Sequence, residues 1–226
     1  METNKQSLCE QIYLGCCKLL LAVIVIAALY LMVVFTPANP LFRAAYNGDM
    51  YVVQNYISEG KDINAHDKWN NTALHWAAKG SQYRLMRLLV DNGIDVNAVN
   101  EQGENALHWS VFSNNKTVIE YLVMQFIDIN AANNAGETPL HLAIILNAFD
   151  SAKVLLHLHA DPNKLTNDGN APLHFIIPNC IEDEKCRDLV DEFKKAGCDM
   201  SLRNQKNVTV LEAVSKTSHL TEKELF

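Results

Sequence analysis

The 226-residue sequence predicts an all-α solenoid of stacked helix–loop–helix–β-hairpin units, preceded by a single hydrophobic helix. Two observations predict this class. A run of 17 consecutive apolar residues occupies positions 19–35. A leucine-histidine pair then recurs at 33-residue intervals, at Leu74-His75, Leu107-His108, Leu140-His141 and Leu173-His174. A fixed period of this kind is typical of repeat arrays, in which each unit leaves one face apolar until its neighbour covers it.

Each unit carries the signals of two helices. Thr72, Asn105 and Thr138 have side-chain oxygens that we expect to accept a hydrogen bond from a free amide at the start of the first helix. Pro139 and Pro172 then fit the first helical position, where no N–H is needed. The second helices show apolar residues at helical spacing, namely Leu85, Leu88, Leu89, Val118, Ile119, Leu122, Val154, Leu155 and Leu156.

The ends of the second helices predict left-handed backbone. Gly60, Gly93 and Gly197 stand just after these helices, at the usual position of a glycine cap. Phe126 and His159 occupy the same position in two other units, so we expect either a left-handed backbone, at a cost of about 1–2 kcal/mol each, or a distorted loop. The hairpin turns are expected at residues that tolerate positive φ, namely Asn70, Gly103, Gly136, Gly169 and Asn207.

The segments around the four pairs resemble the T-P-L-H-x-A signature of ankyrin repeats. They read NTALHWAA from Asn71, NALHWS from Asn105, ETPLHLA from Glu137 and NAPLHF from Asn170. The resemblance implies an ankyrin repeat domain over residues 39–226. It divides this domain into a cap at 39–66, repeats at 67–99, 100–132, 133–165 and 166–203, and a partial C-terminal repeat at 204–226. The fourth repeat carries an insertion and alanine at the cap position, so we expect it to be the loosest unit.

The resemblance also implies what the repeat is for. Its recurring histidines, His75, His108, His141 and His174, are expected to be structural and to hydrogen-bond backbone around the hairpin and the helix start. The hairpin tips and first helices are expected to line a concave groove that binds a protein partner. The candidate partner-binding residues are Lys68, Trp69, Asn71, Lys79, Glu101, Gln102, Glu104, Phe112, Glu137, Ile145, Leu146 and Asp168.

Within this set we expect an acidic hairpin rim above an apolar strip made of Phe112, Ile145 and Leu146. Trp69 falls at a hairpin tip where packing does not require an aromatic side chain, so it is a candidate anchor for the partner. Trp76 and Trp109 share one repeat position and are expected in the core between repeats.

The N-terminal segment predicts a membrane anchor. After a short polar tail at 1–18, the apolar run gives a transmembrane helix at 19–36, about 26 Å long in its apolar part, which suits a thin bilayer. The protein is then a single-pass membrane protein. The alternative is a cleaved signal at residues 1–38, which would make the chain a secreted soluble ankyrin effector of an intracellular bacterium, acting on host proteins.

The membrane orientation is left open by the sequence. Lys5 and Lys18 precede the segment and Arg43 follows it, so the positive-inside rule places the repeats outside the cytoplasm. The resemblance points the other way, because ankyrin arrays are mostly cytosolic.

Composition and motifs exclude several other functions. Asp and Glu outnumber Lys and Arg by 26 to 19, and no basic run occurs, which argues against a nucleic-acid partner. The chain has no phosphate-binding loop, nucleophile elbow or metalloprotease motif, so we expect no enzymatic activity, no cofactor and no small-molecule substrate.

The six cysteines show no regular disulfide framework and are expected to be reduced thiols. Four residues near the insertion have the donor types that zinc prefers, namely His174, Cys180, Cys186 and Cys198. They lack a closely spaced cysteine pair, and His174 already has a repeat role, so we expect no metal there.

Overall fold

The computed structural model describes residues 40–176 and 184–215. These residues belong to one compact unit that begins at Pro40. The predicted tail at 1–18 and the predicted transmembrane helix at 19–36 lie outside the described residues. Within the described ranges, no helix combines the length and apolar character needed to cross a bilayer.

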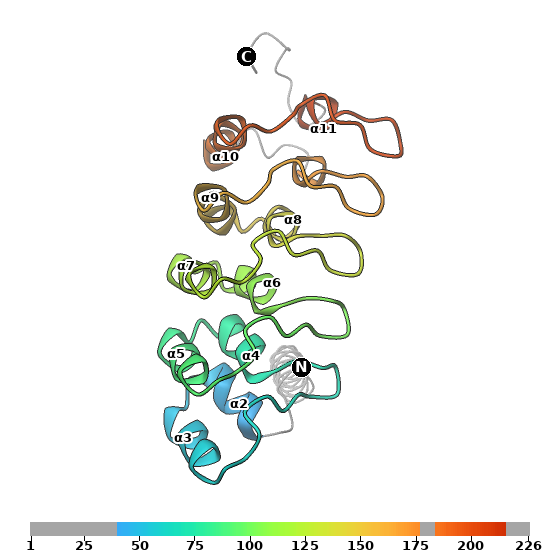
Figure 1. Cartoon of the computed structure of the whole chain (residues 1–226). Coiled ribbons are helices and arrows are strands. Elements are labelled where there is room, and N and C mark those ends of the chain that lie inside the picture. The colour runs from blue at the N-terminus through green and yellow to red at the C-terminus, as the bar shows by residue number, and fades with distance from the viewer. Residues whose placement is uncertain (1–39, 177–183, 216–226) are drawn as a thin grey trace, which may run out of the picture. The chain divides into compact units, whose positions relative to one another are not determined.

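The described residues form helix pairs that stack in chain order, as Figure 1 shows. The first helices of the units are α2 (Pro40–Asn47), α4 (Ala73–Lys79), α6 (Ala106–Ser110), α8 (Pro139–Ile145) and α11 (Val210–Ser215), with the 3-10 helix η2 (Pro172–Phe175) in the fourth repeat. The second helices are α3 (Met50–Ser58), α5 (Tyr83–Asp91), α7 (Lys116–Met124), α9 (Phe149–His157) and α10 (Glu184–Lys195). A short 3-10 helix, η1 (Val111–Ser113), continues α6. The predicted all-helical repeat fold is confirmed for this part of the chain.

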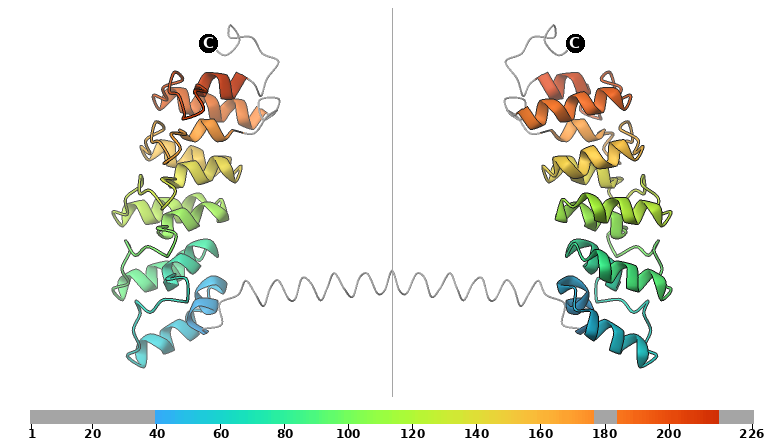
Figure 2. Two further views of the ribbon diagram at one scale, coloured as in Figure 1. Left: turned by 90° about the vertical axis from the view of Figure 1, so that its right-hand side faces the viewer. Right: turned by 90° about the vertical axis from the view of Figure 1, so that its left-hand side faces the viewer.

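The two helices of each unit lie in different rows. Figure 1 shows the hairpin loops along one side of the stack, the first helices beside them, and the second helices on the opposite side. The side views in Figure 2 show the same order of units. Each first helix contacts the next along the row, from α2 through α4, α6, α8 and η2 to α11.

The repeated leucine holds these rows together. Leu74, Leu107, Leu140 and Leu173 are each at most 1% exposed. Full burial of a leucine side chain contributes about 1.5–3 kcal/mol relative to exposure, so the four residues explain why the 33-residue period is maintained. The core continues without a break through the second helices.

The hairpins differ from the prediction in one respect. In the described residues they contain no regular strands, only isolated antiparallel bridges between His66 and Thr72 and between Arg203 and Thr209. Backbone bonds close each turn, as from the N–H of Asn70 to the oxygen of Asp67 at 3.0 Å, and a side chain adds to them. Oδ1 of Asp67 accepts hydrogen bonds from the N–H groups of Trp69 and Asn71, both at 2.9 Å. The same arrangement recurs at Asn100, Asn133 and Asn204.

The tips of neighbouring hairpins lie very close together. A Cβ atom added to Gly103 would meet Oδ1 of Asn134 at 2.6 Å, and one added to Gly136 would meet the backbone N of Asn167 at 2.6 Å. Both glycines also have positive φ, of 76° and 80°. Glycine is therefore required at these tips by backbone conformation and by the close approach of the next hairpin.

A second set of cross-unit bonds lies at the loops that follow the second helices. In each case Oδ1 of an asparagine accepts from a backbone N–H of the next loop. The pairs are Asn64 with Asp95 at 2.7 Å, Asn130 with Asp161 at 2.8 Å, and Asn163 with Asp199 at 2.7 Å. Asn97 occupies the corresponding position in the first full repeat. Among the described residues, the side chain of Asn97 makes no such bond to the next loop. Its N–H donates to Oδ1 of Asp95 in its own loop.

The predicted helix caps are confirmed in part. Oδ1 of Asn105 accepts from the N–H groups of Leu107 and His108, and Oγ1 of Thr138 accepts from His141 at 3.5 Å. The expectation is wrong for Thr72, whose hydroxyl lies 2.9 Å from Nδ1 of His75 and makes no cap bond to an amide. The two proline starts, in α8 and η2, are confirmed.

The predicted left-handed positions are confirmed throughout. Phe126 has φ of 61° and His159 has φ of 68°, where Gly60, Gly93 and Gly197 have φ of 69°, 81° and 83°. The asparagine turns also take positive φ, at 66° for Asn70 and 58° for Asn207. Phe126 is 93% exposed, so its ring does nothing to offset the backbone strain by packing.

The fourth repeat departs most from the period. Its first helix is reduced to the four residues of η2, and Ala171 offers no capping oxygen. Cys186 is disulfide-bonded, so the expectation of reduced thiols is wrong for this residue. A disulfide also removes Cys186 as a zinc ligand, which needs a thiolate. Cys198 is a free thiol, and burial raises its pKa to about 12.

Replacing Phe126 by glycine is expected to stabilise the protein. Removal of the left-handed strain should raise the free energy of unfolding by about 1 kcal/mol, because the exposed ring contributes no packing that would be lost. Urea unfolding followed by circular dichroism measures the change. Phe126→Ala is the matched control, since it removes the ring but keeps the strained backbone. Equal shifts in the two variants would contradict strain as the cause.

Candidate partner-binding surface

The repeat histidines join each unit to the next. Nδ1 of His75 accepts from the N–H of Thr72 at 3.2 Å, and Nε2 donates to the backbone oxygen of Glu104, 29 residues further on, at 3.0 Å. Because Nδ1 accepts an amide N–H, the ring proton lies on Nε2. His108, His141 and His174 make the same cross-unit bond, to the backbone oxygens of Glu137, Asn170 and Val208.

Three of these four histidines have a lowered pKa. Burial lowers the pKa of His75, His108 and His141, and their bonds to backbone carbonyls oppose the shift only in part. Protonation at Nδ1 would also remove the acceptor of the cap amide. Both ring nitrogens of each repeat histidine therefore form hydrogen bonds with backbone around the helix start and the next hairpin, as the resemblance implied.

Buried asparagines link neighbouring hairpins. Asn71 is 2% exposed and Asn100 is 5% exposed, and Nδ2 of Asn100 donates to Oδ1 of Asn71 at 3.0 Å. Nδ2 of Asn71 donates to the carboxylate of Asp67. Asn204 and Asn170 form a matching pair at 2.8 Å. The prediction that Asn71 contacts a partner is therefore corrected. Its side chain is buried and forms a hydrogen bond to the next hairpin.

Two glutamates of the predicted acidic rim are also engaged in the fold. Oε2 of Glu104 accepts from Nδ2 of Asn100 at 3.2 Å and from Nε1 of Trp109 at 2.8 Å. Oε2 of Glu137 accepts from Nδ2 of Asn133 at 3.0 Å. The exposed polar members of the rim are therefore the remaining ones, Glu101, Gln102 and Asp168.

The predicted apolar strip is exposed. Phe112 is 50% exposed, Ile145 is 36% exposed and Leu146 is 40% exposed, and all three lie at or just after the ends of first helices. Tyr46, 38% exposed, ends the row at α2. Tyr46 is not among the predicted binding residues, although it precedes Lys79 by the same 33 residues that separate Lys79 from Phe112. We call Tyr46, Lys79, Phe112 and Ile145 the inner column.

Aromatic rings surround the lysine of this column. Trp76 and Trp109 pack edge to face at 5.1 Å between ring centroids. Nζ of Lys79 lies 4.9 Å from the centroid of the Trp109 ring, 5.4 Å from that of Phe112 and 5.6 Å from that of Trp76. Burial lowers the pKa of Lys79, and attraction to Glu104 opposes that shift. Trp76 is 5% exposed, which confirms its predicted core position.

The hairpin tip of the same repeat carries a second lysine–tryptophan pair. Trp69 is 36% exposed, as expected for a candidate anchor, and Nζ of Lys68 lies 4.1 Å from the centroid of its ring. The backbone oxygen of Trp69 accepts from the N–H of Glu101 at 3.0 Å, which fixes the tip to the next hairpin. The first full repeat thus presents two ammonium groups and several aromatic rings.

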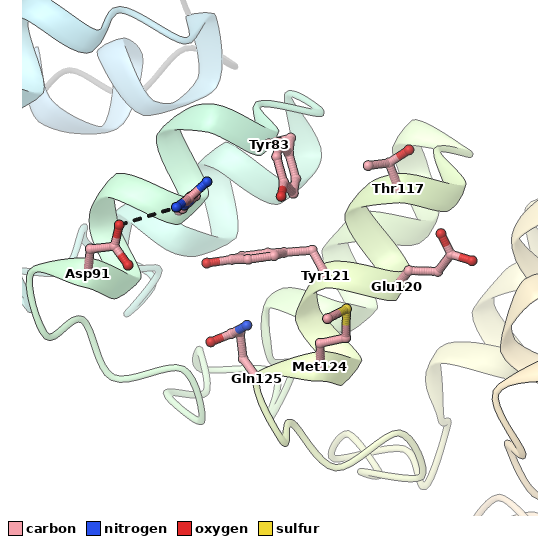
Figure 3. A pocket seen from close by; sticks show the side chains of 8 residues that line it. Tyr83, Asp91, Thr117, Glu120, Tyr121, Met124 and Gln125 are labelled. Carbon is pink, nitrogen blue, oxygen red and sulfur yellow. Dashed lines mark ion pairs between the residues drawn. The ribbon is translucent and has the colours of Figure 1, made fainter.

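The second helices form a separate pocket of about 380 Å³ between α5 and α7, shown in Figure 3. Its lining comprises Tyr83, Arg87, Asp91, Thr117, Glu120, Tyr121, Met124 and Gln125. Tyr83 and Tyr121 pack edge to face at 5.1 Å, and Arg87 pairs with Asp91 at 3.8 Å. None of these lining residues is among the predicted binding residues. The helices α5 and α7 that carry them belong to the row opposite the hairpins (Figure 1).

Family comparison agrees with this geometry. Residues 41–133 match a family model described as ankyrin repeats (3 copies), and residues 122–176 match one described as ankyrin repeats (many copies). The chain therefore contains ankyrin repeats. These repeats imply a protein–protein interaction module, and the family is typically non-enzymatic. Within the described residues, no group of three or more histidine, cysteine or acidic side chains could hold a metal ion.

The buried histidines predict a stability that depends on pH. Their folded pKa values lie below the ordinary 6.5, so the unfolded chain binds more protons at mildly acidic pH. Their stabilising contribution is complete above pH 6.5 and is lost as the pH falls from there through the lowered folded values. Urea unfolding midpoints measured stepwise between about pH 7.5 and 5.5 should fall, and histidine titration by NMR should give three lowered pKa values. A midpoint that stays constant over this range would contradict the assignment.

Replacing Asn100 by alanine tests the hairpin row. The change removes the acceptor of two backbone amides and leaves the buried Oδ1 of Asn71 without its donor. We expect a loss of about 1–3 kcal/mol in the free energy of unfolding. Glu101→Ala, at an exposed side chain on the same tip, is the control and should change it by less than about 0.5 kcal/mol. Similar losses in both variants would show that the Asn100 side chain has no special role.

Proposed function

We propose that this protein is a membrane-anchored, non-enzymatic interaction module that binds a protein partner in the concave groove between its hairpin tips and first helices. The exposed inner column carries the proposal. Large apolar side chains recur there at the repeat period and remain at least 36% exposed, although the ring of Tyr46 also packs edge to face on Trp76. Exposed apolar groups gathered in one place are typical of interaction surfaces.

The row of hairpin tips supports a rigid binding surface. Backbone bonds tie each tip to the next, from Trp69 to Glu101, from Gln102 to Asn134 and from Ala135 to Asn167. Side-chain amides add to them, as Asn134 donates to the backbone oxygen of Glu101 and Asn167 to that of Asn134. A surface that is already ordered loses little conformational entropy when a partner binds.

The membrane anchor is proposed from the apolar run at 19–36 alone. Separation of native membranes from soluble material should recover the chain with the membranes after a high-salt wash. Mass spectrometry of the mature N-terminus should then find residues 1–38 intact. Recovery of a soluble form that begins after residue 38 would favour the secreted effector instead. Protease accessibility in sealed membranes measures which side carries the repeats.

Partner binding is tested by a triple variant of the exposed surface. Trp69→Ala, Phe112→Ala and Ile145→Ala together should abolish capture of the partner identified by affinity capture from native membranes. Loss of several anchor side chains is expected to remove most of the binding energy. The matched control is Tyr83→Ala, Met124→Ala and Phe126→Ala, which removes exposed apolar groups from the second helices and the loop after α7. Thermal unfolding verifies both folds. Capture that survives in the first variant and fails in the control would overturn the groove assignment.

A further inference from the structure

Three of the four residues of the inner column are apolar or aromatic. Tyr46, Phe112 and Ile145 are exposed apolar or aromatic residues at 33-residue spacing, and Lys79 occupies the same position between Tyr46 and Phe112. A partner segment that runs along the column would therefore meet apolar side chains and one ammonium group.

The Lys79 ammonium has no carboxylate partner within the described residues, where the ion pairs involve other side chains. The nearby acid is Glu104, whose Oε2 is already used by Asn100 and Trp109. Three aromatic rings, of Trp76, Trp109 and Phe112, lie around the ammonium and exclude part of its water. A cation that is already partly desolvated loses less hydration on pairing than an exposed one, and it attracts an anion more strongly.

We propose that Lys79 selects a partner segment that carries an aspartate or glutamate flanked by apolar side chains. This inference rests on the proposed function and names the chemistry of the partner. The carboxylate pairs with Lys79, and the apolar neighbours pack on Phe112 and Ile145. Packed helices lie about 8–10 Å apart and an extended chain advances about 3.3 Å per residue. The apolar side chain that contacts Phe112 is therefore expected about three residues from the acid, and the one that contacts Ile145 about six residues from it.

The surrounding charge argues for a single carboxylate rather than a polyanion. Glu101 and Asp168 are exposed on hairpin tips, as is Lys68, and the chain as a whole carries a net charge of −7. A nucleic acid or an anionic lipid surface would be repelled by this excess of negative charge. An isolated carboxylate in an apolar sequence can reach Lys79 while its neighbours remain in contact with the rings.

The test is a selection from a random peptide library displayed on phage, carried out against the full-length protein in detergent. The selected peptides are expected to share an acidic residue with apolar residues about three and six positions away. For a synthetic peptide of that consensus, Lys79→Met should weaken binding about tenfold. Lys116→Met, at an exposed lysine of α7, should change it less than about twofold. Thermal unfolding verifies that both variants fold, and Lys79→Arg should keep most of the affinity.

A change in the peptide separates pairing from general packing. Replacing its acid by the matching amide should weaken binding to the wild type about tenfold and leave binding to Lys79→Met unchanged. Equal effects on both proteins would overturn the proposal.

The selection also separates failure of this inference from failure of the proposed function. Acid-free peptides that lose binding in Phe112→Ala with Ile145→Ala would refute the role of Lys79 and leave the groove intact. Peptides that bind equally well to that double variant would refute both.

Discussion

The stack depends on one hydrogen bond made by each repeat histidine to the backbone of the next unit. The ring can donate from Nε2 only because Nδ1 accepts the amide at its own helix start, so a single side chain fixes a helix cap and a junction together. The bond reaches the residue just before the next helix start, at Glu104 for His75 and at Glu137 for His108. Each unit thereby sets the position of the following helix. Nearest-neighbour coupling of this kind is what makes a repeat array cooperative.

The candidate binding surface follows from the same coupling. Because the histidine, asparagine and backbone bonds occupy the inner polar groups of the hairpins, the side chains left for solvent are those at the tips and at the ends of the first helices. Glu104 illustrates the difference between side chains that bond within the fold and side chains left for solvent. It belongs by sequence to the exposed rim, yet its carboxylate accepts from Asn100 and from the indole of Trp109. The carboxylate attracts the ammonium of Lys79 but forms no ion pair with it among the described residues.

Much of the fold could be predicted from the period, because buried leucines, cap residues and left-handed positions all act within one unit. Phe126 and His159 were assigned left-handed backbone correctly on that basis. Most of the errors concern contacts between units. The burial of Asn71 depends on Asn100 of the next hairpin, and the ring environment of Lys79 depends on Trp109 and Phe112, so no local pattern reveals either. The disulfide at Cys186 also depends on a pairing that spacing does not encode. Thr72 is an error within one unit, where its hydroxyl lies 2.9 Å from Nδ1 of His75.

The junction between the first two full repeats is bonded unevenly. On the hairpin side it has the Asn71–Asn100 pair and the bond from Glu101 to Trp69, whereas on the loop side Asn97 makes no bond to the following loop among the described residues. Away from the hairpins this junction is held instead by Nδ2 of Asn115, which donates to Oγ of Ser81, and by the edge-to-face pair of Tyr83 and Tyr121. Lys79 and Phe112 belong to the two repeats that the junction joins, with Nζ 5.4 Å from the ring centroid. The charged and apolar parts of the proposed contact are therefore set side by side by the packing of two repeats, and neither repeat carries both.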